Sequence, residues 1–410
     1  MPRVMLLIPS ASYRAPDFME AASRLGIEVV VGADRRHPLE DLHPGRQVGL
    51  DFVDLDAGSN QIEAFADEFP VDTIVAVDDG GALLAAAASR RLELPHNPLA
   101  AVEATRNKSL LRRTLAAAGL PSPRFWDIPT DSDPAQIAGS LEFPVVLKPL
   151  ALSGSRGVIR ADHPASFVEA FERLRGILAE PVNARECGPL GGRILVESYI
   201  PGIEVSVEGL LSGGKLQVLA IFDKPDPLEG PFFEETIYVT PSRLSLEEQE
   251  LVSARTARAA QALGLRDGPI HAELRLNDDG AFPIDIAARS IGGLCSRTLQ
   301  FGAGMSLEEI ILRHAIGADL PSVSRESRAA GVMMIPIPAA GVLHAVHGVE
   351  EARAVPLIES VTISIHPGGE VVPLPEGSEY LGFIMARGET PAEVEAALRE
   401  AHRLLHFDIS

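Results

Sequence analysis

The pattern of apolar and polar positions is most regular over residues 271–293, where it predicts a β-hairpin. Side chains point alternately to the two faces of a strand. In the first predicted strand, His271, Glu273 and Arg275 therefore share one face, and the other face is apolar. Asn277–Gly280 supplies the turn, with glycine where the backbone needs a positive φ. The hairpin is thus expected to present a polar row on one side only.

The second predicted strand repeats this alternation, with Asp285, Ala287 and Arg289 on one face. A buried sheet does not normally carry such a row without a charged partner. Carboxylate oxygens suit Mg2+, and a guanidinium binds phosphate or carboxylate through two hydrogen bonds. Glu273 and Asp285 are therefore predicted to hold Mg2+ or Mn2+, with Arg289 facing a transferred phosphate or a substrate carboxylate. The competing interpretation is a ladder of surface ion pairs, and His271 is either structural or catalytic.

Residues 1–105 alternate short β-branched runs with helical stretches, which predicts a parallel α/β domain. A helix is then expected over residues 108–118, with Leu110, Leu111 and Leu115 forming its apolar stripe. This helix would connect the α/β domain to the strand-rich part of the chain.

The next stretch is predicted to hold a strand at 144–150 and a helix around 166–178, whereas 180–192 is rich in proline and glycine and is expected to be an exposed loop. Three strands follow at 193–200, 204–211 and 217–224. Later elements are predicted as helices 245–263 and 306–316, each opened by a capping box, as tail strands near 332–337, 361–365 and 383–386, and as a last helix beginning at Thr390.

Composition narrows the class of protein. The 410 residues allow two to four domains, and 46% apolar with 23% charged residues is usual for a globular protein. A net charge of −21 repels nucleic acids and anionic membranes, so neither is expected as a partner. Cys187 and Cys295 are far apart and show neither a disulfide framework nor metal-ligand spacing. No apolar run reaches about 18 residues, and we expect a cytoplasmic protein.

Lys148 ends a hydrophobic strand just before the serine- and glycine-rich loop 153–157. Backbone N–H groups of such a loop can wrap phosphates, and a nearby lysine can neutralise them. The spacing is not that of a P-loop, so an ordinary surface hairpin is the competing interpretation. Lys108 stands at the start of a predicted helix, where the helix dipole would add to its positive charge.

Glu197 and Glu204 flank the turn at Pro201 and Gly202, between two predicted strands. Carboxylates placed in this way can accept hydrogen bonds from an amine or from ribose hydroxyls. The alternative is a solvated acidic hairpin.

The order of these features resembles the ATP-grasp superfamily, and more closely its L-amino acid ligase branch of carboxylate–amine ligases. The resemblance covers about residues 1–320 as the common body, and the tail from about 325 resembles the extra domain of that branch. It implies an ATP-grasp fold of mixed α/β and α+β class. The implied domains are a Rossmann-like pre-ATP-grasp domain at 1–105, a two-sheet ATP-grasp domain at 106–320 with a mobile lid at about 122–195, and a small α+β C-terminal domain at 325–410.

The resemblance also implies roles for individual residues. Nucleotide contacts would come from Lys108 and Lys148 on the phosphates, from the lid loop residues Ser153, Gly154, Ser155 and Gly157, from Glu197 and the backbone near Tyr199 and Ile200 on adenine, and from Glu204 on the ribose. Metal ligands would be Glu273 and Asp285. Catalysis would involve Arg289, Lys148 and His271, with His271 or a lid carboxylate accepting the proton of the amine.

Substrate binding is implied for the stretch after the second hairpin strand, at Ser290, Gly292, Gly293 and Arg297. Arg297 would clamp a substrate carboxylate, unless it is a surface arginine. Two departures from the superfamily pattern are Ala287, where many members have a metal-binding asparagine, and Asp285, where they have glutamate. The L-amino acid ligase branch also tends to have alanine at the first of these positions.

The activity implied is that of an ATP-dependent carboxylate–amine ligase, which forms an amide through an acyl phosphate and releases ADP and phosphate. Its cofactors would be ATP and Mg2+, its partners a small carboxylate and a small amine, such as amino acids, and a homodimer is implied by relatives. The alternatives are another ATP-grasp enzyme, of the carboxylase or carbamoyl-phosphate type, and an ATP-binding protein without turnover.

Overall fold

The N-terminal domain is a parallel sheet covered by helices on both faces, as predicted. The computed structural model describes residues 1–10, 12–36, 44–302 and 304–410. Alternate residues of the central strand enter two different cores. This is why that strand is continuously apolar. The sheet has the order β3-β2-β1-β4, built from β1 (Arg3–Ile8), β2 (Glu28–Ala33), β3 (Gln47–Gly49) and β4 (Thr73–Ala76), with α1 (Ala15–Leu25) on one face and α2 (Leu55–Glu68) and α3 (Asp79–Arg91) on the other.

Two short helices, α4 (Leu99–Arg106) and α5 (Lys108–Ala117), lead out of this domain. The predicted helix at 108–118 is confirmed, and Asn107 caps it by accepting hydrogen bonds from two backbone N–H groups. Its predicted apolar stripe is wrong in one position. Leu110 is exposed, whereas Arg112 is almost fully buried on the face of Leu111 and Leu115.

Residues 125–198 form a separate four-stranded antiparallel sheet with a helix packed on it, and we call this unit the lid. Phe167, Phe171 and Leu174 of the helix enter the core of the lid. The sheet has the order β5-β8-β6-β7, from β5 (Phe125–Pro129), β6 (Val145–Pro149), β7 (Ile159–Ala161) and β8 (Arg193–Ser198), with α6 (Pro134–Ala138) and α7 (Pro164–Ala179).

The exposed loop predicted at 180–192 is wrong. The segment forms α8 (Pro181–Cys187) and a 3-10 turn (Gly188–Gly192). Proline is tolerated at the first position of a helix, which is where Pro181 stands. The side chain of Asn183 is buried and donates to the carbonyl of Ile177, which ties the short helix to α7.

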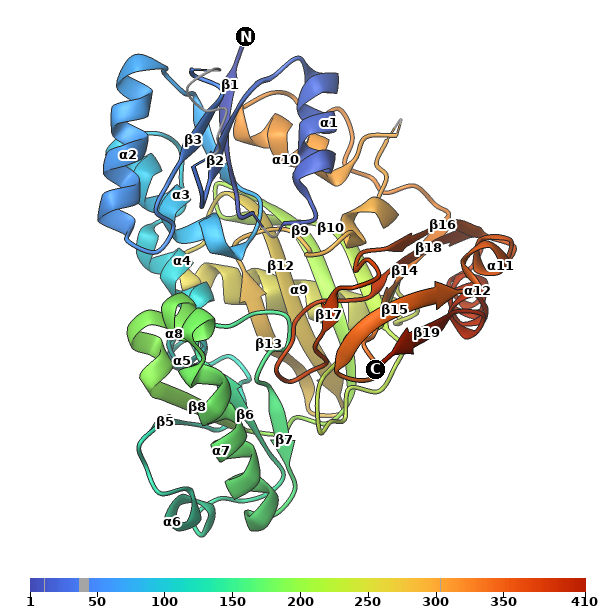
Figure 1. The fold of residues 1–410 in the computed structure, drawn as a ribbon. Coiled ribbons are helices and arrows are strands. Elements are labelled where there is room, and N and C mark those ends of the chain that lie inside the picture. The colour runs from blue at the N-terminus through green and yellow to red at the C-terminus, as the bar shows by residue number, and fades with distance from the viewer. Residues whose placement is uncertain (11, 37–43, 303) are drawn as a thin grey trace.

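An eight-stranded sheet forms the centre of the molecule (Figure 1). One of its faces is covered by α9 (Leu246–Leu263), which begins at the predicted capping box of Ser245 and Glu248. The order is β13-β12-β9-β10-β11-β14-β18-β16, with β9 (Ile203–Ser212), β10 (Lys215–Lys224), β11 (Ile237–Thr240), β12 (Gly268–Asn277), β13 (Gly280–Ala287), β14 (Ala329–Ile335), β16 (Ile358–Ile363) and β18 (Gly382–Gly388).

This sheet crosses the domain boundary that the sequence places near residue 325. Strand β11 pairs with β14, with Ile237 opposite Met333 and Thr240 opposite Ala330. The tail therefore extends the sheet that carries the polar hairpin. The rest of the tail comprises β15 (Gly341–His347), β17 (Glu370–Val371) and β19 (His406–Ile409) in a second small sheet, with α11 (Val349–Arg353) and α12 (Pro391–Arg403), and α10 (Leu307–Ala315) precedes it at the second predicted capping box.

Within the described ranges, no helix has both the length and the apolar character needed to cross a bilayer. Both cysteines, Cys187 and Cys295, are buried and free. The two cysteines therefore do not form a disulfide with each other.

Packing of α12 on the sheet yields a first prediction. Leu398 is fully buried in the core between α12 and the strands of the tail. Leu398→Ala should therefore reduce the free energy of unfolding by about 2–4 kcal/mol, measured by urea denaturation. Leu246→Ala is the matched control, because Leu246 is 78% exposed at the start of α9 and should change stability by no more than about 0.5 kcal/mol. Equal effects of the two substitutions would contradict this packing.

Candidate active site

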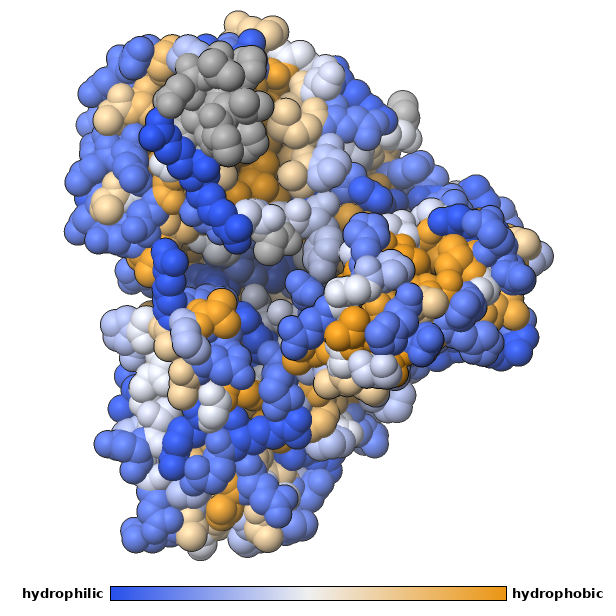
Figure 2. Space-filling model, viewed as in Figure 1, coloured by the Kyte–Doolittle hydropathy of each residue, from blue (hydrophilic) through white to orange (hydrophobic). Residues whose placement is uncertain are grey.

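The polar face of β12 and β13 lies in a hollow where the N-terminal domain, the lid and the C-terminal domain meet (Figure 2). Glu273 lies directly opposite Asp285 in the hairpin register. A β-bulge follows this pair, because Leu274 is paired with Pro283 and leaves Ile284 as the extra residue. Bulges redirect side chains and are frequent beside active sites. Because of this bulge, Ile284 is only half-buried and does not join the apolar face that the sequence predicted for it. Asp285 lies opposite Glu273.

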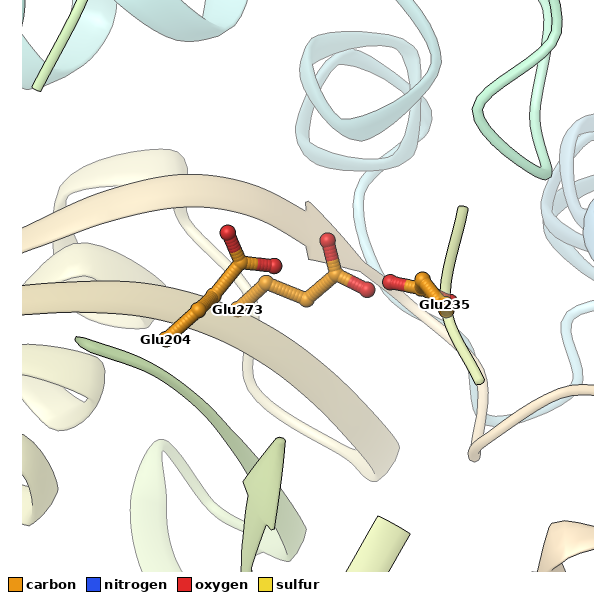
Figure 3. A group of neighbouring side chains, drawn as sticks. All are labelled: Glu204, Glu235 and Glu273. Carbon is orange, nitrogen blue, oxygen red and sulfur yellow. The ribbon is translucent and has the colours of Figure 1, made fainter. Parts of the chain in front are cut away.

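Glu273 of this pair also belongs to a group of three neighbouring glutamates (Figure 3). Glu204 lies on β9, Glu273 on β12 and Glu235 in the segment before β11, and one carboxylate oxygen of each lies within 4.8 Å of the other two. The buried ammonium of Lys224 lies among them, with Nζ 2.8 Å from Glu204, 2.5 Å from Glu235 and 3.2 Å from Glu273. Burial and the neighbouring Glu273 raise the pKa of Glu235 to about 7, although Lys224 opposes this. Lys224 thus compensates part of a strong local negative charge.

The residues predicted as metal ligands have chemistry that fits Mg2+. Asp285 is more than one-third exposed, and the nearest cation in the described residues is Lys108, whose Nζ lies 3.8 Å from Asp285 Oδ2. Glu273 presents a second carboxylate from the facing strand. Two carboxylates on paired strands at a polar hollow are the kind of donor set that Mg2+ takes, together with water and phosphate oxygens.

His271 lies between two carboxylates. Its Nδ1 contacts Glu208, and its Nε2 is 3.3 Å from Glu273 Oε1. Burial favours the neutral imidazole, but Glu208 and Glu273 outweigh it and raise the pKa of His271 to about 9. In this arrangement His271 is a donor to both carboxylates. It would have to release a proton before it could accept one from an amine.

Glu208 is a residue that the sequence did not single out. It is fully buried on β9, and its second carboxylate oxygen accepts a hydrogen bond from the backbone N–H of Ile291 at 3.0 Å. It therefore links His271 to the stretch after β13. The alternation of Glu204, Ser206 and Glu208 along β9 was the available signal, because it places all three on the face of the hollow.

The hinge between the lid and the large sheet is held by Arg275. This buried guanidinium lies 2.9 Å from Glu204 Oε2 and donates at 2.9 Å to both the carbonyl of Ile200 and the hydroxyl of Tyr199. Arg160 of β7 stacks on the Tyr199 ring, 4.2 Å from its centroid. Glu204, Tyr199 and Ile200, which were predicted for ribose and adenine, therefore come together. β8 and β9 belong to different sheets, which rules out the solvated hairpin as the alternative.

Glu197 is buried and has two cationic partners. Its Oε2 lies 2.8 Å from Lys148 Nζ, and its Oε1 lies 2.6 Å from Arg112 Nε. Arg112 also donates to the carbonyls of Pro283 and Ile284 at 2.9 and 2.5 Å. The carboxylate predicted to contact adenine therefore also orients Lys148, one of the two lysines predicted to contact phosphates.

The serine- and glycine-rich loop lies at the end of β6, next to both predicted phosphate lysines. Gly154, Ser155 and Gly157 have left-handed backbone conformations, with φ of 64°, 55° and 73°. Lys108 donates from Nζ to the carbonyl of Leu152 at 2.9 Å. The loop, Lys108 and Asp285 thus form one continuous set of contacts. Ser153 precedes the left-handed residues in this loop.

Arg289 is paired with an acid from the N-terminal domain that the sequence did not reveal. Its NH2 lies 2.9 Å from Asp79 Oδ2, and the other oxygen of Asp79 lies 3.3 Å from Arg106 NH1. Burial disfavours the charged forms of Asp79 and Arg289. Their mutual attraction outweighs it, so the pKa of Asp79 is lowered and that of Arg289 is raised. Asp79 is the first residue of α3, where a carboxylate also favours the helix dipole.

The predicted substrate residues have different surroundings. Ser290 is buried, and its hydroxyl accepts a hydrogen bond from Arg14 at 2.8 Å. Gly293 has a φ of 58°, and a side chain there would meet the ring of Phe383. Arg297 is 41% exposed and pairs with Asp17 at 3.0 Å, which agrees with the surface-arginine alternative. Gly292 lies beside Gly293 with open space at its Cβ position.

Family models match three successive parts of the chain. Residues 19–96 match the ATP-grasp N-terminal domain, residues 141–298 match the ATP-grasp domain, and residues 333–410 match the L-amino acid ligase C-terminal domain 2. The three matched ranges follow one another in the order that the sequence resemblance implies.

Individual proteins give the same pattern. The uncharacterized protein y4rH of Sinorhizobium fredii is 24% identical, with 100% of this chain and 84% of that protein covered. The alanine–anticapsin ligase of Bacillus subtilis is 25% identical, with 62% of this chain and 55% of the ligase covered, so the chain spans about half the length of that relative. The crystal structure of an L-amino acid ligase from Bacillus licheniformis superimposes with a TM-score of 0.84 at 27% identity, covering 100% and 99% of the two chains.

The Glu197 cluster yields a prediction about pH. Burial raises the pKa of Glu197, but Arg112 and Lys148 outweigh it and lower the pKa to about 2. The ionised carboxylate therefore stabilises the fold above its usual pKa of about 4.5, and this contribution is lost as the pH falls towards 2. Glu197→Gln should reduce the free energy of unfolding at pH 7 by about 2–4 kcal/mol, because two buried cations lose their counter-ion.

The measurement is urea denaturation of both proteins from pH 7 down to pH 2.5. The difference between wild type and Glu197→Gln should be constant above pH 5 and shrink below it. Glu142→Gln serves as the control, since Glu142 forms an exposed ion pair with Arg124 and its loss should leave the unfolding transition unchanged. A difference that does not depend on pH would show that the carboxylate charge of Glu197 is not what stabilises the cluster.

Proposed function

The chain belongs to the ATP-grasp superfamily, in its L-amino acid ligase branch, and on this basis we propose that it is an ATP-dependent carboxylate–amine ligase. The proposed reaction joins a small acid to a small amine, both of the amino acid class, and releases ADP and phosphate. The observation that carries the proposal is the Glu273–Asp285 pair, which lies across the hairpin next to Lys108. Two carboxylates on paired strands, with an ammonium group 3.8 Å from one of them, support a role in binding Mg2+ and phosphate.

The nucleotide would lie between the lid and the eight-stranded sheet. Lys108 and Lys148 supply positive charge for its phosphates, and Glu197 keeps Lys148 oriented. The backbone near Tyr199 and Ile200 would contact adenine, and Glu204 the ribose. Arg275 fixes these last residues relative to one another. A protein of net charge −21 needs such a local group of cations to bind a polyphosphate.

Glu273 and Asp285 would hold Mg2+, which when bound neutralises charge on the phosphates and polarises the transferred phosphoryl group. A carboxylate oxygen of the acid substrate would attack the γ-phosphorus, and the bond from that phosphorus to the bridging oxygen of ADP would break. Arg289, held by Asp79, would stabilise the charge that develops on the phosphoryl oxygens. The amine would then attack the acyl carbon, the bond from that carbon to the bridging oxygen would break, and phosphate would leave with this former carboxylate oxygen.

The amine must lose a proton during the second step. His271 donates to Glu208 and Glu273 in the structure, so its first role would be to orient Glu273. A carboxylate of the lid is the alternative acceptor. Ser290, Gly292 and Gly293 would line the substrate side. Ala287, in place of the asparagine of many ATP-grasp enzymes, leaves the metal with one protein ligand fewer, and Asp285 is shorter than glutamate by one methylene group.

The proposal is tested by incubating the protein with ATP, Mg2+ and pools of amino acids while measuring ADP, phosphate and new amides. ADP release that needs both an acid and an amine, with equimolar amide, is the expected result. ADP release that depends on bicarbonate would contradict the ligase and favour a carboxylase. Tight ATP binding without turnover across a broad panel of acids and amines would identify a nucleotide-binding protein instead.

Arg289 provides a sharper prediction. Arg289→Ala should lower the rate of ADP formation by about 10²–10³-fold, because a group that stabilises the transferred phosphoryl charge is lost. ATP affinity, measured by calorimetry, should change by no more than about threefold, since the lysines and the hinge remain. Arg328→Ala is the control, because Arg328 is a half-exposed arginine that pairs only with the exposed Glu389 among the ion pairs of the described residues. Equal losses of affinity and rate would indicate a structural role for Arg289.

A further inference from the structure

A segment of the C-terminal domain contacts the lid next to the serine- and glycine-rich loop. We call residues 372–378, which follow β17, the C-terminal latch. The carboxylate of Glu376 in this segment accepts two hydrogen bonds from Arg173 of α7, at 2.6 Å from Nε and 2.9 Å from NH2. The backbone N–H of Gly157 donates to the carbonyl of Pro375 at 2.8 Å. In Figure 1, β17 lies on the side of the C-terminal domain that faces the lid.

The loop 153–157 packs against both α7 and the C-terminal latch. A side chain at Gly157 would meet Leu174 at 2.8 Å and Pro149 at 3.4 Å, so this glycine is packed directly on the helix that carries Arg173. A side chain at Gly154 would lie 3.3 Å from Ser378 of the latch. The loop is therefore enclosed between α7 on one side and the latch on the other.

Arg173 also contacts a second segment outside the lid. Its guanidinium carbon lies 4.9 Å from the centroid of the Phe232 ring. Phe232 forms a bridge with Ile159 of β7, and Arg160 of the same strand bonds to the carbonyls of Glu229 and Pro231 at 2.6 and 2.8 Å. This second segment ends at Glu235 in the acidic cluster. Arg173 of the lid thus contacts both the C-terminal latch and the segment that contains Phe232.

We propose that the Arg173–Glu376 pair holds the lid closed over the nucleotide, so that the C-terminal domain takes part in excluding water from the reaction. This rests on the proposed ligase function. Arg173 and Glu376 are positioning residues in this scheme, since they act on the loop 153–157 and not on the substrates. The pair keeps Gly157 against Pro375 and so fixes the loop whose backbone is expected to face the phosphates.

The exposure of the pair suits a contact that opens and closes. The side chain of Arg173 is 45% exposed and that of Glu376 is 33% exposed. Exposed ion pairs contribute little to the stability of a fold, although bidentate geometry makes this one specific. Its loss would therefore leave the protein folded and shift the balance between the open and closed lid. An acyl phosphate in an open site reacts with water, so ADP would form without an amide.

The test compares Glu376→Gln and Arg173→Gln with the double exchange Arg173→Glu plus Glu376→Arg. Arg175→Gln is the matched control, because Arg175 lies on the same helix and its ion pair is with Glu172 of that helix. With the substrate pair identified in the amino acid screen, the ratio of ADP to amide should rise about threefold to fivefold in each single variant, the range that loss of an exposed ion pair allows. The ratio should be unchanged in the control and lower in the double exchange than in either single variant.

Hydrogen–deuterium exchange of peptides spanning residues 150–160 gives a readout that does not depend on ligase activity. Exchange should be faster in both single variants, unchanged in Arg175→Gln and slower again in the double exchange. Unchanged exchange in the single variants would overturn the latch even if the protein is a ligase. Faster exchange with an unchanged ratio of ADP to amide would overturn its part in excluding water. Faster exchange with no amide formed by any variant, wild type included, would overturn the ligase proposal and leave the latch standing.

Discussion

The guanidinium of Arg112 joins the two sheets that enclose the hollow. It is almost fully buried, and it binds Glu197 at the end of the lid sheet together with the carbonyls of Pro283 and Ile284 in the bulge of β13. A buried arginine is stable only when such partners surround it. The same side chain therefore orients Lys148 through Glu197 and supports the bulge that sets Asp285 opposite Glu273. The positions of Lys148 and of the Glu273–Asp285 pair therefore depend on one side chain.

Three buried or half-buried cations in the hollow are each paired with at least one acid, so their positive charge is balanced locally in a protein of net charge −21. Lys148 is paired with Glu197 and Arg289 with Asp79, while Lys224 lies among three glutamates. Each acid compensates part of the hydration that its buried cation loses. The pairs also hold the long side chains in defined orientations before any ligand binds, which reduces the entropy lost on binding.

Local features of the site could be predicted from the sequence, and those that depend on distant contacts could not. The two faces of β12, the turn at Gly280 and the capping boxes follow from neighbouring residues, and they are present. The bulge at Ile284 is supported by Arg112, which is 172 positions away. The alternation of polar and apolar residues along the hairpin therefore does not predict it. The helix of Arg112 offered one signal, because a charged residue shared the face of Leu111 and Leu115.

Ion pairs between side chains of different domains could not be predicted from the sequence either. Asp79 binds Arg289 across 210 positions, and no local pattern marks it as part of the site.

The prediction of a loop at 180–192 is wrong for a different reason. The prolines and glycines of this segment suggest a loop, but Pro181 stands where a helix tolerates proline, and burial of Asn183 and Cys187 outweighs the weak propensity of the sequence.

The pairing of β11 with β14 has a mechanical consequence. Strand β11 has only four residues, all buried, and it connects β10, which ends at Lys224, to the strands of the tail. The strands that carry Glu204 and Glu273 therefore belong to the same hydrogen-bonded sheet as the strands of the C-terminal domain. The C-terminal domain is therefore not an independent module. Its removal would leave β11 as an unpaired edge strand, which is prone to associate with the sheet of another molecule. In the proposed scheme, the lid opens and closes relative to this sheet, with the change in backbone angles at Tyr199 and Ile200, where β8 of the lid leads into β9.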